Sequence, residues 1–350
     1  MRKTWLCLAA ALTAVGIVTA AGAQPVPQIL SNVATLSAAE RERVLLEGAK
    51  KEGSLTIYES MAADDMQMLA DAFSKKYGIK TKVWRAGSEA VLQKVVTESR
   101  ANRFEADVVE NNAPEMEALH REKLLQPVTS PMQAELIPEA VPAHKEWVGT
   151  AIDLFVQAYN TQRVKKEDLP TSYRDLLDPK WKGRLGIEAE DHHWFATLVD
   201  QLGTEEGTRL FKEIVATNGI SVRKGHSLLT NLTASGEVPL SLTNYVNRPA
   251  QIKQKGAPIE AFLIQPAIGQ FRGLGVTRNS PHPHAALLFY DFMLSDGQRV
   301  MRDRHYVVSA TTVDSPYKNV KIVFMDPGRV LDKTQEWIKF YDEVVVRRGK

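Results

Sequence analysis

The 350-residue chain contains a single cysteine, Cys7, which lies within the first apolar segment. The rest of the chain therefore has no disulfide framework, no thiolate metal site and no cysteine nucleophile. Secretion into an oxidising compartment would carry no risk of mispaired thiols.

Long hydrophobic runs are also scarce, and the first begins at Trp5, after two basic residues. It ends in Ala21-Gly22-Ala23, the small-x-small pattern of a signal-peptide cleavage site. The run is short for a bilayer span and rich in small residues at its end, so a cleaved signal peptide is favoured over a membrane anchor. We therefore expect a periplasmic protein, with residues 1–23 removed and Gln24 at the start of the mature chain.

The mature chain has little excess charge of either sign. The whole sequence has a formal net charge of +2, and removing Arg2 and Lys3 with the signal peptide leaves zero. Neutrality argues against a binder of nucleic acids or other polyanions. The remaining 327 residues exceed what one hydrophobic core normally holds, so we expect two cores in a monomer.

Motifs of catalysis are missing as well, including the Gly-x-Ser-x-Gly elbow, His-Glu-x-x-His and the phosphate loop. A Ser-x-x-Lys match at Ser315–Lys318 stands in a proline-interrupted connection without its companion motifs. Gly273-Leu274-Gly275 lacks the third glycine of a dinucleotide-binding loop. A secreted hydrolase is therefore only a third hypothesis, and we predict neither enzyme activity nor a cofactor.

Helices and strands alternate along the first half of the chain. Ser37 can cap a helix over 38–52, which Gly53 ends before a strand over 55–58. The following units are a helix at 64–77, a strand at 80–84, a helix at 88–100, a strand at 106–110 and a helix at 115–123. Such alternation predicts parallel sheets covered by helices, with ligand-binding loops at the carboxyl ends of the strands.

Proline-containing connections at 127–142 separate this unit from a second, which an apolar strand at 149–159 enters. The elements expected in it are helices at 173–177, 194–202, 208–217 and 227–235, and strands at 186–187 and 239–243. Strands at 262–266 and 273–277 return toward the first lobe, and helices follow at 284–304 and 334–346. We predict an α/β fold of two lobes. The first holds residues 24–148 and 268–310, and the second holds 149–267 and 311–350.

Six short stretches spread over about 190 residues carry a resemblance to a known family. They are Leu55-Thr56-Ile57-Tyr58, Ala106-Asp107-Val108-Val109, Ala158-Tyr159-Asn160-Thr161, Asp178-Pro179-Lys180-Trp181-Lys182-Gly183, Ser235-Gly236-Glu237-Val238-Pro239 and Asn244-Tyr245. In these stretches and their order, the chain resembles the periplasmic ferric-ion-type and related extracellular solute-binding proteins of ABC importers. The resemblance implies two lobes joined by crossover strands, a small-molecule ligand enclosed between them, and a permease partner in the inner membrane.

Iron-binding members of this family use a His after the first strand, a Glu after the third strand and two adjacent Tyr. Here the first strand is followed by Glu59-Ser60-Met61-Ala62, the Glu position reads Asn112, and the Tyr pair reads Tyr245-Val246. Iron(III) needs several hard anionic oxygens. The resemblance therefore implies a transport role with weak ferric binding or none.

In the first lobe, Arg85 and Ser88 place a cation and a hydroxyl at a helix start, which favours a carboxylate or phosphate-like group. The alternative is that Ser88 only caps the helix and Arg85 faces water. Tyr58 with Ser60, and Asn111 with Asn112, follow neighbouring strands and would line the same wall. Asparagine also favours turns, so these two have a purely structural alternative.

In the second lobe, Glu188-Ala189-Glu190-Asp191-His192-His193-Trp194 contains three carboxylates and two histidines. These residues could bind a metal or a cationic ligand, with Trp194 as an aromatic face. The alternative is that Asp191 caps the following helix and the rest is solvated. The segment Arg223-Lys224-Gly225-His226-Ser227 could add a basic contact.

Our main prediction is a protein that binds a small anionic solute, a carboxylate or phosphonate. The predicted contacts are Tyr58, Ser60, Arg85, Ser88, Asn111, Asn112, Asp191, Trp194, Tyr245, Asn247 and Arg272. The alternative is a receptor for iron, another metal or a metal chelate. Its predicted ligands are Glu190, Asp191, His192 and Tyr245, with Glu188 beside them.

Overall fold

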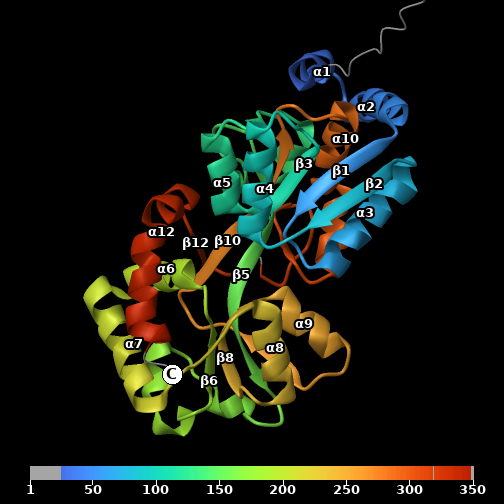
Figure 1. The fold of residues 1–350 in the computed structure, drawn as a ribbon. Helices are drawn as coiled ribbons and strands as arrows, with labels where there is room; N and C mark the ends of the chain where they lie inside the picture. The colour runs from blue at the N-terminus through green and yellow to red at the C-terminus, as the bar shows by residue number, and fades with distance from the viewer. Residues whose placement is uncertain (1–24, 318, 348–350) are drawn as a thin grey trace, which may run out of the picture.

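A continuous twelve-stranded sheet runs through both lobes of the computed structural model, which describes residues 25–317 and 319–347 (Figure 1). Its strands are β1 (Ser54–Glu59), β2 (Lys80–Arg85), β3 (Val108–Asn112), β4 (Leu125–Gln126), β5 (Val148–Asn160), β6 (Leu185–Glu188), β7 (Ser221–Arg223), β8 (Leu240–Tyr245), β9 (Ile259–Phe262), β10 (Ala267–Thr277), β11 (Val307–Val308) and β12 (Ile322–Phe324). The main path is β2-β1-β3-β10-β5-β8-β6-β7. Both the predicted signal peptide and the cleavage site before Gln24 lie outside the described residues.

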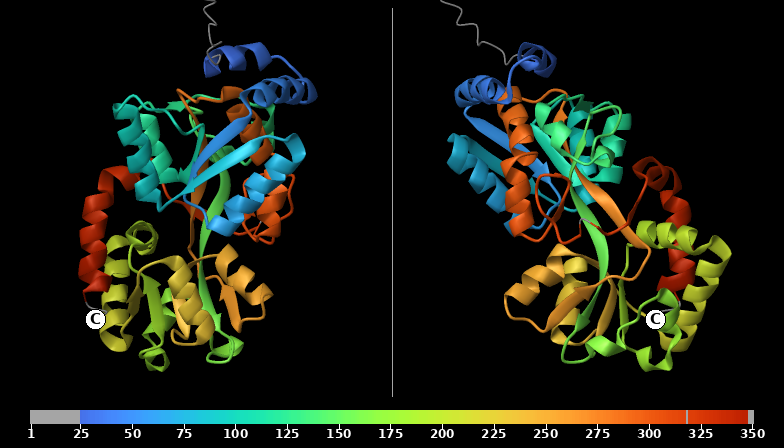
Figure 2. Two further views of the ribbon diagram at one scale, coloured as in Figure 1. Left: turned by 45° about the vertical axis from the view of Figure 1, so that its right-hand side comes forward. Right: turned by 180° about the vertical axis from the view of Figure 1, so that it is seen from behind.

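Helices cover the sheet in each lobe (Figures 1 and 2). They are α1 (Val26–Val33), α2 (Ala38–Glu52), α3 (Ala63–Tyr77), α4 (Ser88–Arg100), α5 (Ala113–Arg121), α6 (His192–Leu202), α7 (Thr204–Asn218), α8 (His226–Ser235), α9 (Asn247–Gln254), α10 (Pro283–Met293), α11 (Asp296–Asp303) and α12 (Pro327–Tyr341). Within the described ranges, no helix is both long enough and apolar enough to cross a membrane.

Strand β5 carries the chain from one lobe to the other, as the middle of Figure 1 shows. It pairs with β10 and β11 over its first half and with β8 and β9 over its second half. Its side chains up to Leu154 pack in the core of the first lobe, whereas Phe155 and Tyr159 pack in the core of the second. All of its residues are buried, and most are apolar, as in a strand covered on both faces; Asp153 and Gln157 are among its polar exceptions.

The pairing directions bring the carboxyl ends of both sets of strands to the junction of the lobes. Strands β3 and β8 each run antiparallel to one of the two crossover strands, β3 to β10 and β8 to β5. Because β1 is parallel to β3 and β6 is parallel to β8, Glu59 and Glu188 also end at this junction. The loops after these strands are where an open α/β sheet binds ligands.

The first-lobe elements follow local signals closely. Helix α2 begins with a capping box between Ser37 and Glu40 and ends at Gly53, whose φ of 78° is the left-handed conformation that favours glycine. The prediction for 38–52 is therefore confirmed. In contrast, Asn111 and Asn112 belong to β3 and pair with β10 instead of forming a loop, because the antiparallel partner extends past them.

Three predicted elements of the later chain are wrong in their bounds. The helix expected at 284–304 is two helices, α10 and α11, because Ser295 leaves the helical conformation and donates its hydroxyl to the carbonyl oxygen of Asp291. The strand expected at 262–266 lies at 259–262, since it must pair with β5. The last helix begins at Pro327, capped by Asp326, instead of at residue 334.

Candidate functional site

Arg272 is the centre of a buried polar network between the lobes. Its guanidinium donates to both carboxylate oxygens of Glu110 at 2.7 and 3.0 Å and to Asp153 at 3.0 Å. It also donates to Ser60 Oγ at 3.0 Å and to Asn112 Oδ1 at 3.3 Å. We call these five residues the hinge network, since they come from β3, β5, β10 and the loop after β1. Arg272 is only 5% exposed, and its guanidinium is already hydrogen-bonded to protein groups. It is therefore not free to bind an anionic ligand, contrary to the expectation from the sequence.

Burial shifts the pKa values of carboxyl groups in and beside this network. Burial raises the pKa of Asp153, although the Arg272 guanidinium opposes the shift. Glu59 lies beside the network, is 0% exposed, and has no hydrogen-bond partner for either carboxylate oxygen. Burial and the nearby Glu110 carboxylate raise the pKa of Glu59 to about 8, so Glu59 holds its proton at neutral pH.

The predicted first-lobe contacts at the start of α4 and the end of β3 lie together. The amide of Asn112 donates to Ser88 Oγ at 3.0 Å, and that of Asn111 donates to the Ser88 carbonyl oxygen at 3.0 Å. The N-cap position of α4 is Gly87, so Ser88 does not cap the helix as the alternative interpretation held. Arg85 is exposed at the end of β2 and donates to the carbonyl oxygen of Met61 at 3.0 Å.

The second lobe contributes a cluster of three groups, Glu188, Asp191 and His226, which we call the acidic-histidine cluster. One ligand atom from each residue lies within 4.8 Å of the others. Asp191 occupies the N-cap position of α6 without capping it, and its Oδ1 lies 3.2 Å from Nε2 of His226. Burial disfavours a charged His226, but the carboxylates of Asp191 and Glu188 outweigh that effect and raise its pKa to about 9.

Tyr245 connects this cluster with the crossover strands. Its ring lies 4.1 Å from the ring of His226, between centroids, and 5.0 Å from that of Phe155. Its hydroxyl accepts a hydrogen bond from Gln270, two residues before Arg272 on β10, at 3.3 Å. Burial and surrounding carboxylates raise the pKa of Tyr245 well above its usual value.

Other predicted contacts point elsewhere. Tyr58 is buried, and its hydroxyl donates to Glu98 and Glu105. The indole of Trp194 packs in the second core, so it presents no free aromatic face. Asn247 is buried at the start of α9.

Two of the predicted metal ligands lie outside the acidic-histidine cluster. Glu190 is exposed and forms an ion pair with Lys224, with 2.8 Å between Oε1 and Nζ. The ring of His192 lies against that of His193, at a centroid distance of 3.9 Å. We did not predict His226 as a ligand from the sequence. We interpreted the segment that contains His226 only as a basic contact, and the sole local sequence signal there is Gly225, at the start of the helix.

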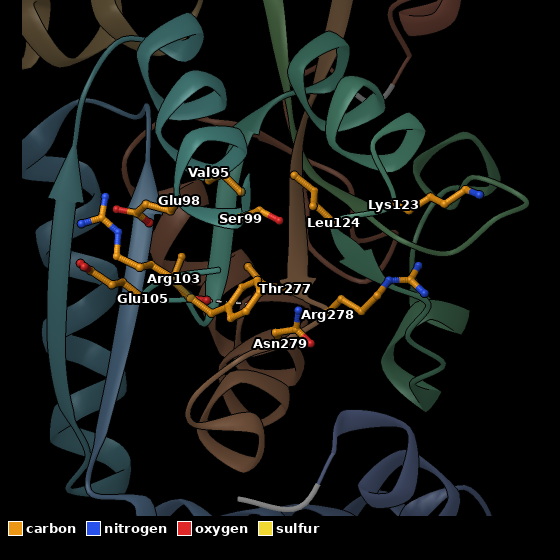
Figure 3. Close-up of a pocket in the computed structure, with 12 residues that line it drawn as sticks. Val95, Glu98, Ser99, Arg103, Glu105, Lys123, Leu124, Thr277, Arg278 and Asn279 are labelled. Carbon is orange, nitrogen blue, oxygen red and sulfur yellow. Dashed lines mark hydrogen bonds between the residues drawn. The ribbon is translucent and has the colours of Figure 1, made fainter. Parts of the chain in front are cut away.

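A small cavity of about 40 Å³ lies in the first lobe, at the end of the sheet away from the hinge network (Figure 3). It is lined by the last turns of α4 and by the residues flanking β3 and β10, including Glu98, Glu105 and Thr277. The side chains of Lys123 and Arg278 extend away from it in Figure 3. Because Lys123 and Arg278 point away from it and it lies far from the polar groups at the junction of the lobes, this cavity is not the candidate site.

The two lobes are also held together beside the crossover strands. Gln251 of α9 donates to Asp65 of α3 at 3.2 Å and to the carbonyl oxygen of Arg304 at 2.9 Å. Asp65 accepts further hydrogen bonds from Arg304 and from the Tyr306 hydroxyl. Helix α12, at the left of Figure 1, packs against both α5 and α6.

The fold has two lobes joined by crossover strands, and polar groups gather where the strands of both lobes end. This arrangement is that of the class of periplasmic binding proteins. Solved structures of similar fold support this class. Iron-bound HitA from Pseudomonas aeruginosa is 22% identical, with a TM-score of 0.71 over 83% of this chain and 99% of that chain. AfuA from Actinobacillus pleuropneumoniae, with fructose-6-phosphate bound, is 23% identical, with a TM-score of 0.71 over 84% of this chain and 99% of that chain.

Sequence comparison identifies the family. Residues 68–318 match the model of the bacterial extracellular solute-binding proteins. An Fe(3+)-binding periplasmic protein of Serratia marcescens is 24% identical over 298 residues, which cover 81% of this chain and 87% of that protein. The chain belongs to the bacterial extracellular solute-binding protein family and is a periplasmic solute-binding protein, as the resemblance predicted, and its curated relatives include proteins named for ferric iron binding.

Proposed function

We propose that this protein is the periplasmic substrate-binding component of an ABC importer, that it captures a cation between its lobes, and that this cargo is iron(III). Family membership supports a binding role over an enzymatic one, and the relative from Serratia marcescens is named for Fe(3+) binding. The partner is then an inner-membrane permease that receives the cargo. For the two lobes we keep the ranges predicted from the sequence, 24–148 with 268–310 and 149–267 with 311–350, as part of this proposal.

The observation that carries the proposal is the charge balance at the junction of the lobes. Glu110 and Asp153 share one guanidinium, that of Arg272. Of the other two carboxylates, in the acidic-histidine cluster, Asp191 pairs with the imidazole of His226, and Glu188 lies within 4.8 Å of both. Four carboxylates therefore surround two cationic groups, and this excess of negative charge attracts a cation and repels an anion.

The carboxylate or phosphonate solute predicted from the sequence, and the weak or absent ferric binding predicted with it, have weaker support than this proposal. The guanidinium of Arg272 is already bonded to two carboxylates and is not free for an anion. Arg85 is exposed, but it belongs to β2 of the first lobe, whereas Asp191 and Glu188 belong to the second lobe. An anionic group would therefore fit only as part of a metal chelate that leans toward Arg85.

A thermal-shift screen separates these ligands, because a ligand that binds only the folded state stabilises it by RT ln(1 + [L]/Kd). The probes are iron(III) nitrilotriacetate, zinc chloride, free nitrilotriacetate, citrate and a set of alkyl phosphonates. We expect the midpoint to rise with the iron(III) complex and to stay unchanged with free nitrilotriacetate. A rise with metal-free citrate or phosphonates alone would contradict the cation proposal and restore the anion prediction.

A further inference from the structure

The acidic-histidine cluster is assembled from three separate elements of the second lobe. Glu188 ends β6, Asp191 stands before the first turn of α6, and His226 is the first residue of α8. The parallel pairing of β6 with β7 brings the loops that follow them to the same edge of the sheet. The cluster is therefore a product of the fold and not of one loop.

Backbone groups hold the Glu188 carboxylate in place. Its Oε1 accepts a hydrogen bond from the Gly225 amide at 2.7 Å, next to His226. The Glu188 backbone is held as well, because its amide donates to Thr243 Oγ1 at 3.1 Å and its carbonyl oxygen accepts from the Tyr341 hydroxyl at 2.6 Å. These contacts fix two sides of the cluster before any ligand arrives.

Two atoms of the cluster remain without partners. Asp191 is 6% exposed, and its Oδ2 is buried without a hydrogen-bond partner. Nδ1 of His226 is likewise buried and unpartnered. Buried polar atoms nearly always have a partner, so two unpartnered atoms in a cluster of three possible ligands point to a group that binds there.

The structure assigns Glu188, Asp191 and His226 as the protein ligands of the metal cargo, an inference that rests on the proposed function. Two carboxylate oxygens and one imidazole nitrogen form a set that first-row transition-metal cations accept. His226 binds the metal as neutral imidazole, so its proton leaves to solvent when the ion enters. The remaining coordination positions stay open to water or to a chelating anion from the first-lobe side.

The same geometry has a simpler interpretation, in which Asp191 and His226 form only a structural ion pair. Under that interpretation, their substitution lowers the free energy of unfolding but leaves metal affinity unchanged. Glu190 and His192 provide matched controls, because they carry the same chemistry in the same segment but lie outside the cluster.

The experiment is a calorimetric titration with iron(III) nitrilotriacetate and, separately, with zinc chloride. The variants are Glu188→Gln, Asp191→Asn and His226→Gln, and the controls are Glu190→Gln and His192→Gln. We expect each cluster variant to lose more than the roughly 10- to 100-fold of affinity that loss of an outer-shell partner costs, and each control to bind like the unmodified protein. Unfolding in the presence of a chelator checks that each variant is folded.

X-ray absorption of the iron-loaded unmodified protein gives a second test that does not depend on the variants. One imidazole among the nearest ligands supports the assignment, and a spectrum without imidazole overturns it. Metal binding that is unchanged in all three cluster variants also overturns it, while leaving the proposed function intact. If the unmodified protein binds neither probe, the proposed function fails and the assignment fails with it.

Discussion

Both lobes place charged groups at the ends of buried strands, but the two lobes differ in how those groups are paired. In the first lobe, the carboxylate of Glu110 is paired with Arg272, and the neighbouring Ser60 and Asn112 complete the hydrogen bonds of that guanidinium. In the second lobe, Glu188 and Asp191 both lie beside one imidazole, and an Asp191 oxygen has no partner. Apart from the neighbouring Glu59, which keeps its proton, the first set has its hydrogen bonds made, whereas the second still has atoms available for a ligand.

This difference shows why a count of polar residues near a hinge does not locate a ligand. A side chain that the fold already saturates contributes to the geometry of the hinge, and binding to it would require breaking existing bonds. The unsaturated groups are the ones that gain most from an added ion. We therefore expect substitutions in the hinge network to act mainly on folding and those in the acidic-histidine cluster to act mainly on binding.

The largest effect is expected from Arg272→Met, which removes the shared cation and leaves Glu110 and Asp153 buried without it. Breaking a buried ion pair in this way typically costs about 3–5 kcal/mol, so we expect a loss of that order in the free energy of unfolding. Urea denaturation measures it. Arg85→Met is the matched control on an exposed arginine, and an equal loss in both variants would contradict the comparison.

Glu59 gives a pH-dependent test beside the same network. Its folded-state pKa of about 8 lies above its ordinary value of 4.5, so the folded state binds the proton more tightly than the unfolded state. The resulting stabilisation is complete below about pH 4.5 and is lost as the pH rises to about 8.

Glu59→Gln should remove this dependence, because the amide stays neutral. We expect the variant to match the unmodified protein near pH 5 and to melt at a higher temperature near pH 8. Exposed Glu190→Gln serves as control and should leave the pH profile of the melting temperature unchanged. A Glu59→Gln profile that falls in parallel with that of the unmodified protein would show that Glu59 is ionised in the folded state.

Tyr245→Phe and Arg85→Ala compare the two sides of the site directly. The first removes a hydroxyl that accepts from Gln270, so it should cost about 0.5–1.5 kcal/mol of the free energy of unfolding, as is usual for one hydrogen bond, and leave iron(III) affinity nearly unchanged. Arg85→Ala should leave iron(III) affinity unchanged, or raise it slightly, because a cation gains nothing from Arg85. Calorimetry measures both. A large loss in Arg85→Ala alone would mean that the first lobe binds an anion.

The last test concerns the contact between α9 and α3. Gln251→Ala removes hydrogen bonds to Asp65 and to the Arg304 carbonyl oxygen, each worth about 0.5–1.5 kcal/mol. The ligand-free protein should then spend more time open and show a larger radius of gyration in small-angle scattering. Lys253→Ala, on the same helix but paired with Glu260 inside the second lobe, is the control. Equal radii for both variants would show that Gln251 does not restrain the lobes.

Much of the fold could be predicted from the sequence because its signals are local. The cap at Ser37, the glycine at Gly53 and the apolar run of β5 each act within a few residues. Element bounds failed where a distant strand decides them, as for Asn111, which stays in β3 because β10 pairs with it. The hydrophobic periodicity of one strand does not show how far the neighbouring strand in the sheet extends.

The candidate site was predicted only in part, for the same reason. Asp191 and Arg272 were expected from local pattern, but their true partners, His226 for one and Glu110 for the other, are distant in sequence. The alternative metal set included His192 because it adjoins Asp191, whereas the fold brings His226 of α8 to Asp191. Which acidic and basic groups neutralise each other depends on strand order, and composition does not reveal it.

The central claim is that the acidic-histidine cluster of the second lobe, and not the hinge network, holds the cargo. Diffraction at the iron absorption edge from crystals of the iron-loaded protein tests it most directly. The account predicts one anomalous peak at about 2.0–2.2 Å from oxygen or nitrogen atoms of Glu188, Asp191 and His226. A peak beside Ser60 and Asn112, or no peak together with a metal-free organic anion bound at Arg85, would contradict it.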